Sequence, residues 1–262
     1  MAVDLFSFLY HQLLKEKVPN PTYTARMILE KELCPDATLA ELKRGVPLER
    51  LLKQVEFFGG VFEINSHVLI PRPETELMVD AIANVLRNDQ RKNISFLDLC
   101  TGSGCIGISL KNYHRSLQLF ASDISQDALD CAKANAALLD VEGDFRLGDL
   151  LEPWFGFRFD FIVCNPPYIS IEHFHQLDAS VRNFDPMIAL TDGQDGLSFY
   201  RALSKKIKDY LNPGGQFFTE IGYDQGVVVK EIFQGAGLKV VSIGQDYSGR
   251  DRWIHVEGDE CS

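Results

Sequence analysis

An apolar run at residues 158–163 is followed by Cys164 and then by Asn165, two adjacent prolines and Tyr168. Proline has no N–H donor and a fixed φ, so a strand inside a parallel sheet must stop at Pro166. A glycine turn would stop the strand more cheaply, yet this segment carries an amide and an aromatic ring. The stretch 165–168 is therefore a candidate site for chemistry.

This segment suits the methylation of a planar NH2 group, such as an amide or an exocyclic base amine. The lone pair of such a nitrogen is delocalised, so the group needs two acceptors that hold its protons and aim it at an electrophilic methyl group. The side-chain oxygen of Asn165 provides one acceptor, and the carbonyl of Pro166, stiffened by Pro167, provides the other. Tyr168 offers a flat wall for packing. Positioning of this kind accelerates transfer without an initial proton abstraction.

A second candidate is the glycine-rich turn "DLCTGSGCIG" (98–107), in which Gly102, Gly104 and Gly107 satisfy the spacing G-x-G-x-x-G. Glycines let the backbone approach a nucleotide, and Asp123, at the end of the following strand, can accept hydrogen bonds from ribose hydroxyls. The spacing alone is a weak indication, because a tight strand-to-helix turn without a ligand has the same pattern.

Two further carboxylates favour S-adenosylmethionine over a dinucleotide. Asp98 lies at the end of a strand, where it can order the turn or meet the ammonium group of a methionine moiety. Asp149 ends another strand in "LGDLL", where an adenine amino group can be held. Loop capping explains either residue alone equally well. Together with Asp123, they place carboxylates at the ends of three successive strands.

The elements that must position these residues alternate between strand and helix. Such alternation predicts a mostly parallel sheet covered on both faces, with ligands at the carboxyl ends of its strands. A helix from Ser125, its N-cap, and another that stops at "NPGG" (212–215) lie between strands. The seven predicted strands are 94–99, 117–123, 144–149, 159–164, 215–222, 238–243 and 252–257.

The chain divides into three predicted regions. Residues 1–53 read as three helices, the third of them covering both "TLAELKRG" and "LERLLKQV", and we expect this region to recognise the substrate. Residues 54–71 read as a β-hairpin linker around Gly59-Gly60. Residues 72–262 form the predicted catalytic domain.

Composition narrows the function classes. Hydrophobic residues make up 45% and charged residues 24%, which is typical of a globular protein, and no apolar run is long enough for a membrane span. The first residues lack the features of a signal peptide. Six scattered cysteines favour reduced thiols in a cytoplasmic protein, and His173 and His175 lack a third metal ligand, so we expect no metal site. The net charge of −11 argues against binding a nucleic acid backbone.

The motifs "DLCTGSG" and "NPPY", with Asp123 and Asp149, resemble class I S-adenosylmethionine-dependent methyltransferases of planar amino groups. The stretches "VLIPRPETE" (68–76), 181–201 and 212–222 are similar to the PrmC/HemK family, which methylates the N5 amide nitrogen of glutamine in peptide chain release factors. The resemblance covers most of residues 44–257. Of these stretches, "IPRPETE" discriminates best, because related enzymes share NPPY without it.

The resemblance implies a Rossmann-like α/β fold with a seven-stranded sheet, a small N-terminal helical domain and a hairpin linker. It implies that Asn165 to Tyr168 hold the substrate glutamine in a Gly-Gly-Gln loop of class I release factors, and that Arg72 and Glu74 shape the cleft rim or form a surface ion pair. It further implies S-adenosyl-L-methionine as cofactor, S-adenosyl-L-homocysteine as product, a monomer and a cytoplasmic location. The implied cofactor-binding residues are Asp98, Cys100, Thr101, Gly102, Ser103, Gly104, Asp123, Asp149, Leu150 and Asn165.

Three residues depart from the family pattern. Cys100 stands where glycine is usual, which a negative φ would permit. Asp185 replaces a glutamate in "FEP", and Arg50 replaces a tyrosine in "PLxY". The N-terminal helical region is also shorter than usual, which bears on the choice of partner more than on the chemistry.

Three other functions remain open from the residues alone. A nucleic-acid amino methyltransferase would need a basic groove and contacts that unstack a base, which the acidic composition disfavours. A nicotinamide oxidoreductase would leave NPPY and Asp98 without a role. A binding module that has lost catalysis is disfavoured by the intact Asn165 and glycine turn.

Overall fold

The computed structural model describes residues 2–258, and these form a helical N-terminal region, a hairpin and a large α/β unit. The N-terminal helices are α1 (Ala2–Lys15), α2 (Pro21–Glu30), α3 (Pro35–Lys43) and α4 (Leu48–Leu52). The hairpin pairs β1 (Gln54–Phe57) with β2 (Gly60–Glu63) in antiparallel register. Its two-residue turn is Phe58-Gly59, both at positive φ, so the turn lies one residue earlier than predicted.

The α/β unit is built on a seven-stranded sheet in the order β5-β4-β3-β6-β7-β9-β8. Neighbouring strands are parallel except where β9 pairs with β7 and β8. The prediction of a seven-stranded, mostly parallel sheet is therefore confirmed. The strands are β3 (Ile94–Leu99), β4 (Leu117–Asp123), β5 (Gly143–Leu147), β6 (Phe159–Cys164), β7 (Leu211–Glu220), β8 (Lys239–Gln245) and β9 (Asp251–Glu257).

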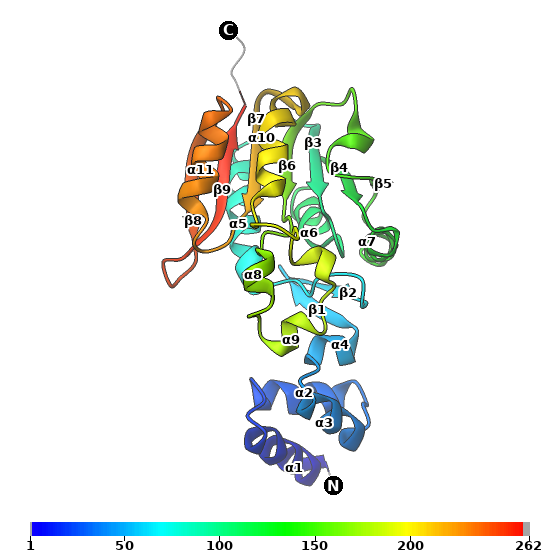
Figure 1. The fold of residues 1–262 in the computed structure, drawn as a ribbon. Helices are drawn as coiled ribbons and strands as arrows, with labels where there is room; N and C mark the ends of the chain where they lie inside the picture. The colour runs from blue at the N-terminus through cyan, green and yellow to red at the C-terminus, as the bar shows by residue number, and fades with distance from the viewer. Residues whose placement is uncertain (1, 259–262) are drawn as a thin grey trace.

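Helices cover both faces of this sheet, as Figure 1 shows. One face packs against helices α5, α6 and α7, and the other against α10 and α11. Phe96 of β3 contributes to the first core and Leu97 to the second, because successive side chains of a strand point to opposite faces. The remaining helices are α5 (Pro73–Arg87), α6 (Cys105–Tyr113), α7 (Gln126–Leu138), α8 (Ile171–Phe174), α9 (Ala179–Arg182), α10 (Ser198–Tyr210), α11 (Gly226–Gly235) and the 3₁₀ turns η1 (Glu152–Trp154) and η2 (Met187–Ala189).

Of three helix predictions, one is confirmed and two hold only in part. The Ser125 hydroxyl accepts the N–H of Ala128 at 3.3 Å and so caps α7 as predicted. In contrast, α10 ends at Tyr210, and the "NPGG" segment belongs to β7 instead of acting as the stop. The predicted third N-terminal helix is two helices, since Gly45 at φ 83° and Pro47 interrupt it.

The N-terminal helices have a hydrophobic cluster of their own, which includes Leu9, Leu13 and Ile28. Figure 1 shows α1–α4 beyond the ends of the strand arrows, on the side of α8 and α9. The carboxyl ends of the parallel strands thus face the N-terminal region. Within residues 2–258, no helix is both long and apolar enough to span a bilayer.

Candidate functional site

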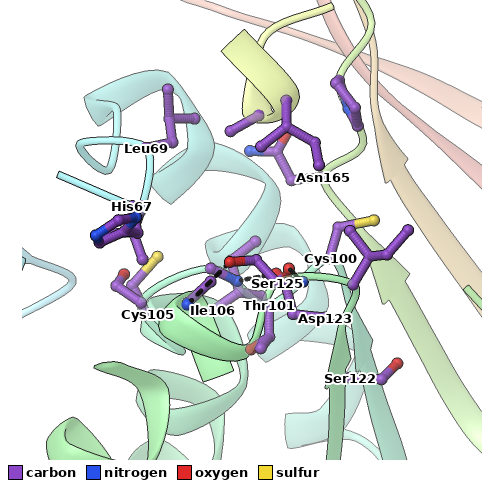
Figure 2. A pocket seen from close by; sticks show the side chains of 18 of the residues that line it. His67, Leu69, Cys100, Thr101, Cys105, Ile106, Ser122, Asp123, Ser125 and Asn165 are labelled. Atoms are coloured by element: carbon purple, nitrogen blue, oxygen red, sulfur yellow. Dashed lines mark hydrogen bonds between the residues drawn. The ribbon is translucent and has the colours of Figure 1, made fainter. Parts of the chain in front are cut away.

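A cavity opens where β3, β4 and β6 end, because Leu99 aligns with both Ser122 and Cys164 in the sheet register. In Figure 2, Asn165 lies above the turn that carries Thr101. Nine predicted site residues line this cavity: Cys100, Thr101, Gly102, Ser103, Asp123, Asp149, Leu150, Asn165 and Pro167. The structure of residues 2–258 leaves four others outside the lining: Asp98, Gly104, Pro166 and Tyr168.

Asp98 organises the glycine-rich turn from behind. Its side chain is fully buried, and one oxygen, Oδ2, accepts the Thr101 hydroxyl at 2.7 Å and the Gly107 N–H at 3.0 Å. The other oxygen, Oδ1, lacks a hydrogen-bond partner among the described residues. Burial raises the pKa of Asp98 from 3.8 to about 7, although these two hydrogen bonds oppose the shift. Asp98 is a candidate either for ordering the turn or for binding the ammonium group of the ligand. Its hydrogen bonds within the chain are those that order the turn.

Asp123 joins the turn to the end of β4. Its Oδ2 accepts the Gly102 N–H and its Oδ1 accepts the Ser125 N–H, both at 2.9 Å. Burial raises its pKa. A carboxylate oxygen has two lone pairs, so each oxygen retains one for a ligand hydroxyl at the cavity. Asp123 can therefore fix the turn and still bind a ribose.

Two glycines of the turn are required by geometry. Gly104 has φ 80°, and a Cβ there would lie 2.6 Å from Ile108 Cδ1. At Gly107, a Cβ would lie 2.8 Å from Leu119 Cδ1 and 3.0 Å from Asp98 Oδ2. A side chain at Gly107 would push α6 away from the sheet and disturb the Asp98 contacts, whereas one at Gly104 would crowd Ile108 and Ala132 of α7.

Cys100 adopts φ 56°, so the condition that would permit a residue other than glycine without strain, a negative φ, is not met. This conformation favours glycine, and it strains a residue with a Cβ. The Cys100 sulfur lies 3.9 Å from that of Cys164, whose S–H points toward it. Cys164 is the last residue before Asn165, so the two thiols join the glycine-rich turn to the NPPY segment.

Asp149 and Leu150 complete the cavity beside β4. Leu150 has φ 46°, and its carbonyl accepts the Ser122 hydroxyl at 3.3 Å. This bond holds the segment that follows β5 against the end of β4. Asp149 thereby lies near Asp123, as an adenine-binding and a ribose-binding group would have to lie.

Tyr168 is held by a buried carboxylate that the sequence reasoning missed. Its hydroxyl donates to Glu220 Oε1 at 2.9 Å, and the Thr75 hydroxyl donates to Glu220 Oε2 at 2.6 Å. Burial raises the pKa of Glu220, and burial together with the Glu220 charge raises the pKa of Tyr168. The sequence could have indicated Glu220 by its position, since it ends β7 at the same edge of the sheet as Asn165.

A second missed group is the ion cluster of Arg50, Arg72 and Asp185. Asp185 Oδ1 accepts from Arg50 at 2.7 Å and from the Ile70 N–H at 3.1 Å, while Oδ2 accepts from Arg72. The side chains of Asp185 and Arg50 are only 1% and 9% exposed, respectively. The two departures from the family pattern, Arg50 and Asp185, are therefore direct partners. Arg72 also lines the cavity, whereas Glu74 lies 4.0 Å from Arg252.

The geometry favours binding over acid–base chemistry. Asp98, Glu220 and Tyr168 are all engaged in hydrogen bonds within the protein, and Asn165 carries a neutral amide into the cavity. Among residues 2–258 there is no group of three His, Cys, Asp or Glu side chains that could hold a metal ion. The arrangement can cradle a nucleoside-like ligand beside the amide of Asn165.

Solved structures resemble the chain in fold. A methyltransferase from Pyrococcus furiosus is 17% identical, with a TM-score of 0.53 over 73% of this chain and 88% of that one. A Listeria monocytogenes protein assigned to the class I S-adenosylmethionine-dependent methyltransferases is 14% identical, with a TM-score of 0.51 over 100% and 88% of the two chains. These likenesses place the chain in the class I methyltransferase fold.

Sequence comparison defines the family. Residues 74–184 match the model of the methyltransferase small domain. Release factor glutamine methyltransferases from Bacillus subtilis and Clostridium acetobutylicum are 40% and 37% identical, each over 81% of this chain and 75% of the relative. One from Fusobacterium nucleatum is 33% identical over 96% of this chain and 77% of its own length. The chain therefore belongs to the family of release factor glutamine methyltransferases.

Proposed function

We propose that this enzyme transfers a methyl group from S-adenosyl-L-methionine to the N5 amide nitrogen of the glutamine in the Gly-Gly-Gln loop of peptide chain release factors. The observation that carries the proposal is the position of Asn165, at the end of β6 and on the wall of the cavity formed by the glycine-rich turn. In a member of this family, that juxtaposition brings an amide-binding segment to a methyl donor.

The cavity residues fit S-adenosylmethionine, which supplies an electrophilic methyl group and leaves as S-adenosylhomocysteine. Asp123 has free lone pairs for the ribose hydroxyls, and Asp149 lies beside it for the adenine amino group. Gly102 at φ 56° keeps the backbone open, with nothing within 4 Å of a Cβ position. Asp98 acts on the ligand through the turn that it orders.

The NPPY segment holds the substrate amide. Asn165 Oδ1 and the Pro166 carbonyl accept the two N–H groups, which turns the nitrogen toward the methyl group. Tyr168 lies beside the cavity lining, where its bond to Glu220 fixes the ring and anchors the segment. The amide proton leaves after transfer, so the segment needs no general base.

Substitution of Asn165 tests this mechanism. We expect Asn165→Ala to fold and to bind S-adenosylmethionine in calorimetry, but to methylate glutamine at least ~10²-fold more slowly, because one of two positioning acceptors is lost. Turnover close to that of the wild type would contradict the mechanism. Asn93→Ala, at an exposed position outside the cavity lining, is the matched control for the effects of substitution itself.

The substrate assignment is tested separately. The enzyme is incubated with tritiated S-adenosylmethionine and with release factor, ribosomal protein or nucleic acid. We expect label in release factor, and in a fragment that contains the Gly-Gly-Gln loop. Label confined to nucleic acid would overturn the assignment, although the net charge of −11 already disfavours that substrate.

We further propose a division of labour along the chain, with residues 1–53 for recognition of the release factor, 54–71 as linker and 72–262 for catalysis. The N-terminal helices face the carboxyl ends of the strands (Figure 1), so a protein seated on them can present a loop to the cavity. On this proposal the enzyme acts as a monomer on class I release factors, in the cytoplasm where they terminate translation, and without direct contact to nucleic acid.

A further inference from the structure

Two thiols meet at the point where the glycine-rich turn and the NPPY segment lie side by side. Cys100 follows β3 and Cys164 ends β6, on adjacent parallel strands, and their sulfurs are 3.9 Å apart. A disulfide has a sulfur–sulfur distance of about 2.05 Å, so the pair needs a movement of about 2 Å to form one. This is the range of a side-chain rotation combined with a small backbone adjustment.

The two thiols differ in accessibility. Cys100 is partly exposed and lines the cavity, and Figure 2 shows it between Asn165 and Asp123. Cys164 is fully buried and directs its S–H at the Cys100 sulfur. A small oxidant that enters the cavity therefore reaches Cys100 first, and Cys164 is already in place as the second thiol.

We propose that Cys100 and Cys164 form a hydroperoxide-sensitive thiol pair, and that its oxidation to a disulfide closes the cofactor cavity. The Cys100 thiolate attacks one oxygen of the hydroperoxide, the O–O bond breaks, and Cys100 becomes a sulfenic acid while an alcohol or water leaves. Cys164 then attacks the Cys100 sulfur, and the S–O bond breaks with release of water. In sum, two thiols are oxidised, one hydroperoxide is reduced, and a dithiol reductant reverses the change.

The backbone strain at Cys100 explains why a disulfide to Cys164 would disturb the cofactor cavity. Cys100 sits at φ 56°, directly before the turn whose amide at Gly102 binds Asp123. A disulfide would draw the Cys100 sulfur toward Cys164. This would bring the glycine-rich turn closer to Cys164 and hence to the neighbouring Asn165. Bound S-adenosylmethionine would occupy the cavity and shield Cys100, so the oxidant and the cofactor compete.

The test is peptide mapping of the full-length enzyme after treatment with hydrogen peroxide and alkylation of the remaining thiols. We expect a linked peptide that joins residues 100 and 164, with a mass about 2 Da below the sum of the two thiol peptides. A dithiol should remove the link and restore cofactor binding. If both residues remain fully alkylated while other cysteines oxidise, the proposal is wrong.

Two variants sharpen this experiment. Cys164→Ala should abolish the link and leave Cys100 over-oxidised, so that loss of cofactor binding is no longer reversed by the dithiol. Cys34→Ala, which removes an exposed thiol of the N-terminal region, should give the wild-type yield of link. Equal reversibility in Cys164→Ala and the wild type would overturn the role of Cys164.

Repeating the peroxide treatment with saturating S-adenosylmethionine distinguishes a failure of this inference from a failure of the proposed function. We expect the cofactor to lower the yield of the 100–164 link at least ~10-fold by covering Cys100. A link that forms equally with and without the cofactor would refute the proposed cofactor site, whereas absence of the link in both cases would refute the thiol pair.

Discussion

At the scale of single residues, the site depends on carboxylates that are buried before any ligand arrives. Asp98 and Glu220 each hold two donors from different segments of the chain, and each has a pKa raised by burial. Burial of a carboxylate costs stability when it is ionised. In return, the oxygens are fixed in place, which keeps the glycine-rich turn and the ring of Tyr168 in position.

The pKa of Asp98 yields a prediction about pH. A carboxyl whose pKa is about 7 in the folded state and 3.8 in the unfolded state binds more protons when folded between these values. Its contribution to stability is therefore complete below about pH 4 and is lost as the pH rises through about 7. Asp98→Asn, a neutral isostere, should match the wild type near pH 4 and become relatively more stable toward pH 7, by up to about 1.4 kcal/mol per pH unit.

Urea denaturation across this pH range measures the difference in the free energy of unfolding, because groups that do not interact with Asp98 contribute equally to the variant and the wild type. Asp209→Asn, at an exposed position of α10, is the matched control and should track the wild type. A constant difference between Asp98→Asn and the wild type at all pH values would contradict the assignment.

At the scale of elements, the cluster of Arg50, Arg72 and Asp185 ties three segments together. Arg50 belongs to α4, Arg72 precedes α5, and Asp185 follows α9, so one buried carboxylate links the N-terminal region to two segments of the α/β unit. Arg50 also donates to the Val68 carbonyl at 2.7 Å, within the linker. The cluster thereby sets how the helical region meets the α/β unit.

A double-mutant cycle tests this link. Asp185→Ala should lower the free energy of unfolding by about 3–5 kcal/mol, because it leaves the buried guanidinium of Arg50 without its carboxylate. Arg50→Ala combined with Asp185→Ala should cost less than the sum of the single changes, with a coupling of at least ~1 kcal/mol. Arg44→Ala, from an exposed pair with Glu41, should change stability by less than about 0.5 kcal/mol. Strict additivity of the first pair would rule out the link.

At the scale of the whole molecule, the helical region presents apolar residues to solvent on α1, the helix that Figure 1 shows farthest from the sheet. Leu5 and Phe8 lie one turn apart on α1 and are 39% and 47% exposed. Contiguous exposed apolar surface can mark a protein-interaction site, so this pair is a candidate contact for a protein partner. This arrangement agrees with the proposed docking of a release factor on residues 1–53.

We expect Phe8→Ser to lower kcat/KM for a full-length release factor by about 10-fold, which corresponds to about 1.4 kcal/mol of lost binding. The rate with a short Gly-Gly-Gln peptide should stay unchanged, because such a peptide does not reach α1. Phe155→Ser, at an 87% exposed position near the start of β6, is the control. Equal losses with both substrates would contradict docking on α1.

Much of this protein follows from local sequence. The order of strands and helices, the Ser125 cap and the placement of Gly102 and Asn165 at strand ends are encoded within a few neighbouring residues, through periodicity, capping and the absence of a proline N–H. For the same reason, the sequence also indicated which strand ends would converge, since parallel strands bring their carboxyl ends to one edge.

The tertiary structure decided the pairings between distant residues. Arg50 meets Asp185, Thr75 and Tyr168 meet Glu220, and Cys100 meets Cys164, across separations of 52 to 145 positions. No local pattern specifies such contacts, because they depend on strand order and on the packing of loops over the sheet edge. The positive φ of Cys100 is also a result of the tertiary structure, since the surrounding contacts keep its backbone in a conformation that residues with a Cβ disfavour.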